Sequence, residues 1–252
     1  MTASGPPSSR LAQLAAALAS ASMVLVLVSL IGVQAGLLAP MTSFLLFAVG
    51  ALLGGVLSAL LGGIAALLTR GGADPLGSKR ALSSLVVGIG LVVLVVVAGA
   101  PGADVPSIND ITNNLESPPT FDAAKRTAAN RDRDMGYPES FKPQVEEAYG
   151  DLHPFSLDAT PAECFADSLQ AAKSLGWTLT DSNPAAGTFE AEDRTAIFRF
   201  VDDVAVRVRP TSAGCAVDVR SKSRDGQGDL GANANRIRVF GEELDSIAGA
   251  SN

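Results

Sequence analysis

Basic side chains recur in the second half of the sequence at spacings that would place them on one face of a β-sheet. They are Arg199, Arg207, Arg209, Arg220, Lys222 and Arg224. A guanidinium group binds phosphate or carboxylate through paired hydrogen bonds, so such a face could hold a lipid phosphate, an acidic glycan or another carboxylate. The alternative is structural. Glu190, Glu192 and Asp218 fall on the same predicted face and could form cross-strand ion pairs with the basic residues.

Two cysteines and one histidine complete the residues with distinctive chemistry, namely Cys164, Cys215 and His153. Outside the cytoplasm the two thiols would form a disulfide if their separation allowed it, and otherwise they would be two separate buried thiols. His153 has no partners at metal-ligand spacing, so we predict no metal site. The sequence lacks a phosphate-binding loop, a dinucleotide-binding fingerprint and a nucleophile elbow, so we also predict no cofactor and assign no catalytic residue.

Short runs of alternating apolar and polar residues must position these side chains. The runs lie near 177–180, 188–192, 196–200, 204–209 and 215–222. Turns are predicted at 183–187 and at Asp202-Asp203. Period-two alternation over successive runs predicts an antiparallel sheet with one buried face.

One helix is predicted before these strands in the sequence, and another after them. Thr160, Pro161 and Glu163 combine an N-cap, a first-turn proline and a capping box, and Gly176 supplies a stop, so a helix should span 161–175. Asp229 can cap a final helix, whose apolar residues recur every three to four positions. The order of elements predicts an α+β soluble domain with an antiparallel sheet and two packing helices.

Proline-rich sequence precedes the first of these helices. Residues 101–159 should be mostly extended chain laid over the core, with one short helix at about 122–130.

The first hundred residues predict a three-helix transmembrane region at 15–100. Its apolar stretches run from about 15 to 38, 43 to 68 and 81 to 100, and none contains Asp, Glu, Lys, Arg or His. Each is long enough to cross a bilayer, which takes about 20 apolar residues. We therefore expect a multi-pass protein of the plasma (inner) membrane, whose first partner is the lipid bilayer.

Basic residues in the short loops set the expected orientation. Arg10 lies in the N-terminal segment, residues 1–14, and Arg70, Lys79 and Arg80 lie around the second loop. Because positive loops stay in the cytoplasm, residues 101–252 should form a non-cytoplasmic domain, periplasmic or extracellular. A cleaved signal peptide ending near 33–35 is the alternative for the first stretch, and it leaves this placement unchanged.

The second apolar stretch has small residues at fourfold spacing, Gly50, Gly54, Ser58 and Gly62. Such a stripe allows close helix approach. It predicts either packing within the three-helix bundle or a homo-oligomer formed through the second transmembrane helix.

Three groups of residues in the soluble half resemble a known family. One runs from Val219 to Arg224 (VRSKSR) and continues with Gly226, Asp229, Leu230, Gly231, Asn233, Ala234, Arg236 and Ile237. The second consists of Asp110-Ile111-Thr112, Pro118-Pro119 and Phe121, and the third of Tyr149, Pro154 and Pro161-Ala162. Together they resemble the domain of unknown function 1499 family over about residues 104–248.

The resemblance implies one coherent domain, found in bacteria and plastids and often behind membrane helices. It also implies that Ser223, Arg224, Asp229, Asn233 and Arg236 belong to a shared feature. A strand–turn–helix junction at these residues would present free backbone N–H groups and could bind an anion. The alternative is that Asp229 merely caps the helix.

The charge composition limits the classes of partner that this protein is expected to bind. Residues 101–252 carry 15 basic and 25 acidic side chains. Their net charge of −10 disfavours nucleic acid, and the uncharged spans disfavour ion transport. We expect a membrane-anchored bacterial envelope protein that is a binding or assembly module for an anionic ligand or a protein partner. The alternative is an envelope hydrolase acting on lipid or cell-wall material. The candidate ligand-binding residues are Arg207, Arg209, Arg220, Arg224, Asp229, Asn233 and Arg236.

Overall fold

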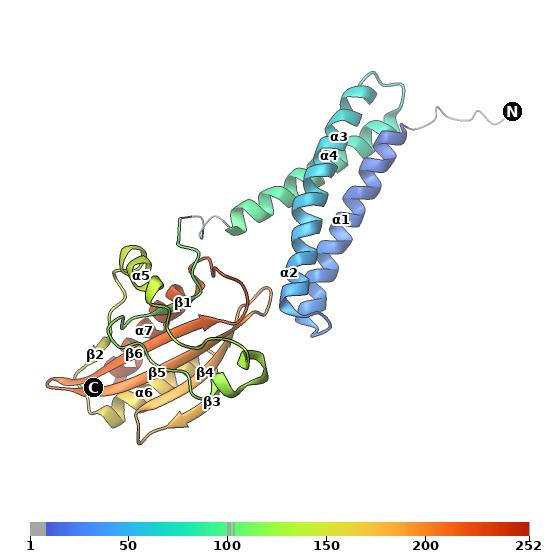
Figure 1. Ribbon diagram of the computed structural model, residues 1–252. Coiled ribbons are helices and arrows are strands. Elements are labelled where there is room, and N and C mark those ends of the chain that lie inside the picture. The colour runs from blue at the N-terminus through green and yellow to red at the C-terminus, as the bar shows by residue number, and fades with distance from the viewer. Residues whose placement is uncertain (1–8, 100–101, 103, 252) are drawn as a thin grey trace. The chain divides into compact units, whose positions relative to one another are not determined.

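The computed structural model describes residues 9–99, 102 and 104–251, which form two compact units (Figure 1). One unit lies within residues 1–101 and also takes in the segment 196–199, and the other comprises 102–195 and 200–252. The first unit is helical and apolar, whereas the second combines strands with helices.

Three long helices make up the N-terminal unit. α1 spans Arg10–Gln34. The second helix runs without a break through α2 (Pro40–Ala48), the π-helical η1 (Val49–Gly54) and α3 (Gly55–Thr69), and α4 spans Pro75–Gly99. All three are long and apolar enough to cross a bilayer, with mean hydropathies of 2.5, 2.4 and 2.8. The three predicted apolar helices are confirmed, although each begins a few residues earlier than predicted.

Glycines of the second helix face its neighbours in this bundle. A β-carbon at Gly62 would lie 2.6 Å from the Leu85 backbone nitrogen in α4, and one at Gly50 would lie 3.0 Å from the Ser22 carbonyl oxygen in α1. Close packing therefore depends on the missing side chains. The homo-oligomer through the second helix stays a prediction.

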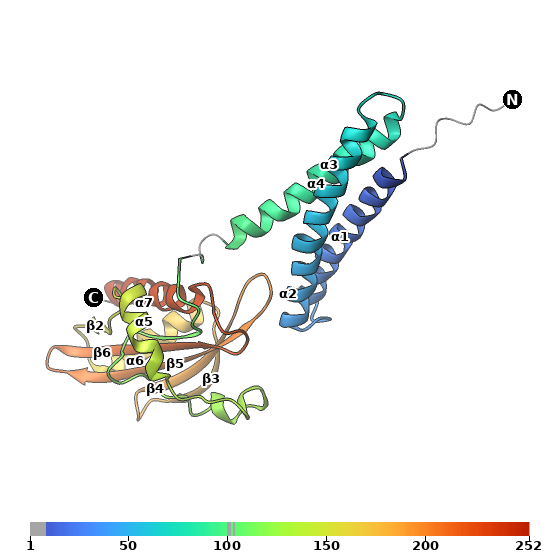
Figure 2. The ribbon, with the colours of Figure 1, turned by 45° about the horizontal axis from the view of Figure 1, so that its top comes forward.

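One antiparallel sheet forms the centre of the soluble unit. Its strands are β1 (Asp110–Thr112), β2 (Phe155–Leu157), β3 (Thr178–Asn183), β4 (Thr188–Arg194), β5 (Val201–Thr211) and β6 (Gly214–Ser223). They are ordered β1-β6-β5-β4-β3, and β2 also pairs with β6. The helices α6 (Pro161–Ser174) and α7 (Ala232–Ser251) lie against one face of the sheet (Figure 2). This arrangement confirms the predicted α+β class.

The main core lies between this face and the two helices. Val204 and Val206 of β5 and Val219 of β6 are at most 1% exposed and pack with Ile237 and Phe240 of α7. The predicted start of α6 is also observed, because the Thr160 hydroxyl accepts from the Glu163 backbone N–H and the Glu163 carboxylate accepts from the Thr160 backbone N–H.

The opposite face of the sheet is covered as well, so the expectation of a single buried face is wrong. Residues 113–141, called here the covering segment, lie across it, and Phe121, Ala124 and Met135 form a second apolar cluster with Ala205. The segment contains the 3₁₀ turns η3 (Ala124–Arg126), η4 (Ala128–Asn130) and η5 (Glu139–Phe141). η3 and η4 stand in place of the short helix predicted at 122–130. The α5 helix (Lys142–Ala148), which follows the segment, was not predicted.

Two other local predictions are wrong. Residues 196–200, predicted as a strand, form the loop between β4 and β5, which closes through a hydrogen bond from the Thr195 N–H to the Phe200 carbonyl (2.9 Å). Asp202 and Asp203, predicted as a turn, lie inside β5 and are 2% and 1% exposed. Both carboxylates are accommodated in a strand because arginines from other elements pair with them.

Candidate functional site

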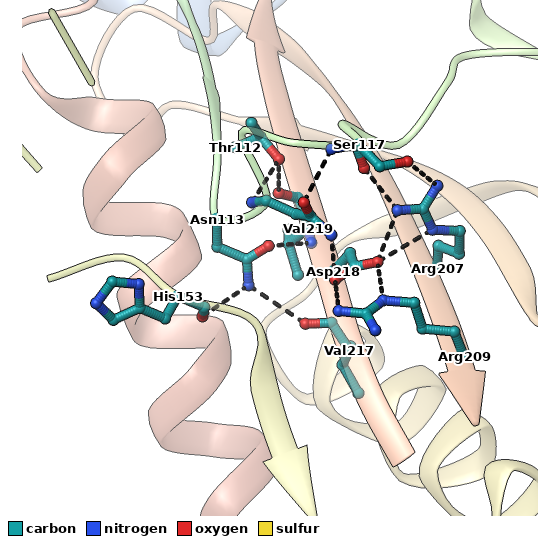
Figure 3. A network of polar contacts seen from close by, with 10 residues as sticks. Thr112, Asn113, Ser117, His153, Arg207, Arg209, Val217, Asp218 and Val219 are labelled. Carbon is teal, nitrogen blue, oxygen red and sulfur yellow. Dashed lines mark hydrogen bonds and ion pairs between the residues drawn. The ribbon is translucent and has the colours of Figure 1, made fainter. Parts of the chain in front are cut away.

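Two of the predicted ligand-binding arginines share one buried carboxylate (Figure 3). Oδ2 of Asp218, which is fully buried, accepts from Arg207 Nη2 at 2.7 Å and from Arg209 Nε at 2.9 Å. Oδ1 accepts from the Asn114 side chain at 3.0 Å, and Arg207 Nη2 also donates to the Ser117 carbonyl at 2.6 Å. Two cations against one carboxylate leave this cluster with one excess positive charge.

Asn113 fixes the chain that supplies Asn114 and Ser117 (Figure 3). Its side-chain oxygen accepts from the Val219 N–H at 2.7 Å, and its amide nitrogen donates to the carbonyls of Val217 (3.3 Å) and His153 (3.1 Å). The backbone carbonyl of His153 thus takes part in this network. No group of three or more His, Cys, Asp or Glu residues is arranged to hold a metal ion within the described part of the chain.

Arg220 and Lys222 belong to a second, more deeply buried cluster. Asp110 on β1 accepts two hydrogen bonds from Arg220, at 2.8 and 2.7 Å, and one from Lys222 at 2.8 Å. Asp110, Arg220 and Lys222 are 0%, 1% and 6% exposed. A ligand in solvent cannot reach these cations unless the covering segment moves away.

The covering segment encloses the Arg220 guanidinium from the other side. Arg220 donates to the carbonyls of Pro119 (3.1 Å) and Met135 (3.0 Å). Its guanidinium carbon lies 4.7 Å from the Phe121 ring centre and 5.2 Å from that of Tyr137. Burial raises the pKa of the Tyr137 phenol above its usual range. Arg220 therefore holds the segment on the sheet.

Arg224 and Arg236 each pair with two carboxylates. Arg224 binds Asp203 and Glu192, each at 2.5 Å, and the hydrogen bond to Asp203 is the main reason that the Arg224 pKa is raised. Arg236 binds Asp193 and Asp202, each at 2.6 Å. Burial raises the pKa of Asp202, and Arg236 opposes that rise.

The predicted anion site before α7 is filled by the protein's own carboxylate. Asp229 accepts from the backbone N–H groups of Gly231 and Asn233, both at 2.9 Å. The Asn233 side chain bonds to Ser221 and Ser223 rather than pointing to solvent. These contacts agree with the structural alternative for the junction, in which the residues shape the strand–turn–helix connection.

Glu190 anchors the covering segment instead of pairing across strands as the structural alternative expected. Its carboxylate accepts from the backbone N–H groups of Asp122, Ala123 and Ala124, with the last at 2.8 Å. A pocket of about 210 Å³ lies beside this contact, with Arg126 and Arg207 in its lining. No ion pair of the exposed Arg126 side chain is observed among the described residues.

Sequence reasoning did not select Arg126, Asn113, Asn114 or Ser117. Nothing in their spacing marks them, because they become neighbours of the sheet only when the covering segment folds onto it. Asp110 did have a signal, since it opens one of the motifs that resembled the family.

Cys164 in α6 and Cys215 in β6 form a disulfide, with their Cα atoms 6.6 Å apart. This separation is within the range that disulfides require. The bond ties α6 to the central sheet.

Comparison with known families shows which family this domain belongs to. The family model described as "Protein of unknown function (DUF1499)" matches residues 110–244, more than half of the chain. The chain belongs to the DUF1499 family. The match begins at Asp110, the carboxylate of the buried cluster, and extends to Leu244 in α7, so it covers the whole sheet. None of the curated proteins compared with the chain matches it.

Proposed function

We propose that the chain is a membrane-anchored binding module whose soluble domain takes a small anionic ligand in the pocket lined by Arg126 and Arg207. The observation that carries this proposal is that the exposed Arg126 lines the same pocket as Arg207, which belongs to the positively charged cluster of Arg207, Arg209 and Asp218. Guanidinium groups bind phosphate and carboxylate through charge-assisted hydrogen bonds.

Three acidic residues, Asp122, Asp181 and Glu190, also line the pocket, and two of them are engaged with other groups. Glu190 accepts the three backbone hydrogen bonds described above, and Asp122 pairs with Lys125 at 2.7 Å. Hydrogen bonding by Lys125 lowers the pKa of Asp122, so this carboxylate stays charged and paired at neutral pH. Arg207 donates to Asp218 and Ser117, so Arg126 is the exposed cation of the lining that offers its guanidinium to a ligand.

We also propose that the soluble domain faces the periplasm or cell exterior. The basic residues Arg10, Arg70, Lys79 and Arg80 favour a cytoplasmic N-terminus and second loop, which sends residue 101 outward after three spans. The Cys164–Cys215 disulfide supports the same side, because structural disulfides persist in oxidising compartments.

A titration with inorganic phosphate tests the binding proposal. Full-length protein in detergent should bind phosphate saturably, and Arg126→Ala should weaken binding by about tenfold or more, because a charge-assisted hydrogen bond contributes about 1.5–3 kcal/mol. Arg131→Ala is the matched control, since Arg131 is an exposed arginine outside the pocket lining. Equal losses in the two variants, or no saturable binding, would exclude the pocket. Hydrolysis of a phosphate ester by the wild type would favour the envelope hydrolase instead.

A reporter fused after residue 252 tests the sidedness. A phosphatase that folds only outside the cytoplasm should be active in this fusion, and activity from a cytosol-only reporter would refute the proposed orientation. Crosslinking of the full chain in membranes tests the homo-oligomer predicted through the second transmembrane helix, and a pattern of monomers only would refute it.

A further inference from the structure

Basic residues gather at one end of the three-helix bundle. The charged residues among the first hundred positions are Arg10, Arg70, Lys79, Arg80 and one acid, Asp74. Arg10 opens α1, Arg70 follows the end of α3, and the other three lie in or just before the first two turns of α4. Figures 1 and 2 show the start of α1 and the α3–α4 connection at the same end of the bundle. Four basic side chains against one acidic side chain give this end an excess of three positive charges.

Asp74 holds the start of α1 against the start of α4. One of its carboxylate oxygens accepts from the Ser9 backbone N–H at 2.6 Å, and the other accepts from the Gly77 backbone N–H at 2.8 Å. Three fully buried alanines, one from each long helix, also pack together at this end: Ala12, Ala65 and Ala81. The two helices are therefore fixed to each other here, and the surface between them has a defined shape.

An open groove of about 590 Å³ lies between α1 and α4 at this end. It is lined by Gln13, Ala16, Ala17, Ser20, Leu76 and Arg80. The four lining residues of α1 follow the spacing i, i+3, i+4 and i+7, which places them on one face of the helix. Three of these four have short side chains. The groove therefore exists because this face of α1 leaves space beside the longer side chains of α4.

The groove crosses the boundary between polar and apolar sequence. Gln13 and Arg80 each lie just before the apolar stretch of their helix, and these stretches begin at about 15 and 81. Ser20 lies seven residues beyond Gln13, which is about 10 Å further along α1. In a bilayer, one end of the groove would thus lie at the depth of the headgroups and the other at the depth of the acyl chains.

We infer that this groove binds one anionic phospholipid of the surrounding bilayer. The lipid phosphate contacts Arg80, whose guanidinium has five N–H donors and can bind a phosphate while it keeps a contact with the protein. One acyl chain lies along Ala16 and Ala17, where the short side chains leave room for it. The positive charge at this end favours an anionic headgroup over a zwitterionic one. The site is independent of the Arg126 pocket, because it uses the membrane helices and a lipid rather than the soluble domain and a small anion.

Native mass spectrometry of the full chain in a neutral detergent tests this inference. The protein is mixed with equal amounts of phosphatidylglycerol and phosphatidylcholine that carry the same acyl chains, and the bound lipids are identified. The wild type should retain phosphatidylglycerol in preference to phosphatidylcholine. Arg80→Ala should weaken phosphatidylglycerol binding by about tenfold, the loss typical of one charge-assisted hydrogen bond. Arg70→Ala is the matched control and should bind like the wild type, because Arg70 is an exposed arginine at the same end that does not line the groove.

A second pair of variants tests the shape of the groove without changing its charge. Ala17→Leu fills the groove and should weaken phosphatidylglycerol binding. Gly90→Leu should not, because Gly90 lies outside the lining and a β-carbon there meets no atom within 4 Å. Equal binding of the two lipids, or equal losses within either pair of variants, would overturn the inference. Displacement of the lipid by an equal concentration of inorganic phosphate would also overturn it, because the ligand would then be the free anion.

Discussion

Replacing Asp110 by asparagine is expected to destabilise the soluble domain by about 3–5 kcal/mol, the range found when one member of a buried ion pair is removed. Asp110 is the carboxylate that both Arg220 and Lys222 contact, and all three side chains are buried. The substitution leaves two buried cations without a counter-ion. Asparagine keeps the size of the side chain, so the loss would report charge rather than packing.

Replacing Arg220 by methionine removes a cation of the same cluster and keeps the other one. Arg220→Met leaves Asp110 paired with Lys222 at 2.8 Å, so no buried charge loses its only partner. It removes the hydrogen bonds to the carbonyls of Pro119 and Met135, and two unsatisfied acceptors cost about 1–3 kcal/mol each at most. Part of this cost is offset by burying an apolar side chain of similar length. Lys222→Met added to Asp110→Asn should restore part of the loss.

Equilibrium denaturation of the full chain in detergent measures these differences through Trp177. This single tryptophan is 7% exposed and stacks on Phe240 with ring centres 5.2 Å apart, so its emission should report unfolding of the core. Lys125→Met is the control, because the Lys125–Asp122 pair is exposed and should contribute less than about 1 kcal/mol. A double variant, Asp110→Asn with Lys222→Met, that is no more stable than Asp110→Asn would refute the charge argument.

Three further outcomes follow from contacts described above. Replacing Cys164 and Cys215 by alanine should lower stability by about 4 kcal/mol, from the entropy of a loop closed over a separation of 51 residues, and the denaturation midpoint with and without reductant checks this. Burial raises the pKa of Asp202, so the folded state holds that proton more tightly and the contribution of Asp202 to stability falls as pH rises above its unfolded value of about 3.9. The stability of Asp202→Asn relative to the wild type should therefore rise as the pH is raised above about 4, and melting curves that show the opposite trend would contradict this. Thr160→Ala should cost about 1 kcal/mol and speed hydrogen exchange in the first turn of α6, whereas Thr160→Ser should not.

Local signals in the sequence predicted the helices well. The capping box at Thr160 and Glu163, the left-handed Gly176 and the cap at Asp229 act within a few residues of the helix ends they determine. The apolar spans of the N-terminal unit are equally local, because length and hydropathy suffice to mark them.

Strand boundaries and the charge clusters depended on distant residues. Asp202 and Asp203 have the composition of a turn, and only Arg236 and Arg224 make their burial in β5 favourable. Arg207 lies opposite Asp218 through the register of β5 with β6, which alternation alone does not determine. The covering segment lacks periodicity, so its position over the second face could not be read from its residues.

The pairing of β1 with β6 joins residues that are far apart in the chain, since Asp110 and Arg220 are separated by 110 positions. During synthesis the first of these emerges well before the second, and contacts of such separation form slowly. Residues 110–141 therefore stay unpacked, with their apolar side chains exposed, until nearly the whole chain has been synthesised. A domain of this design is expected to be prone to aggregation or proteolysis during that interval, and truncation before β6 should leave no stable intermediate.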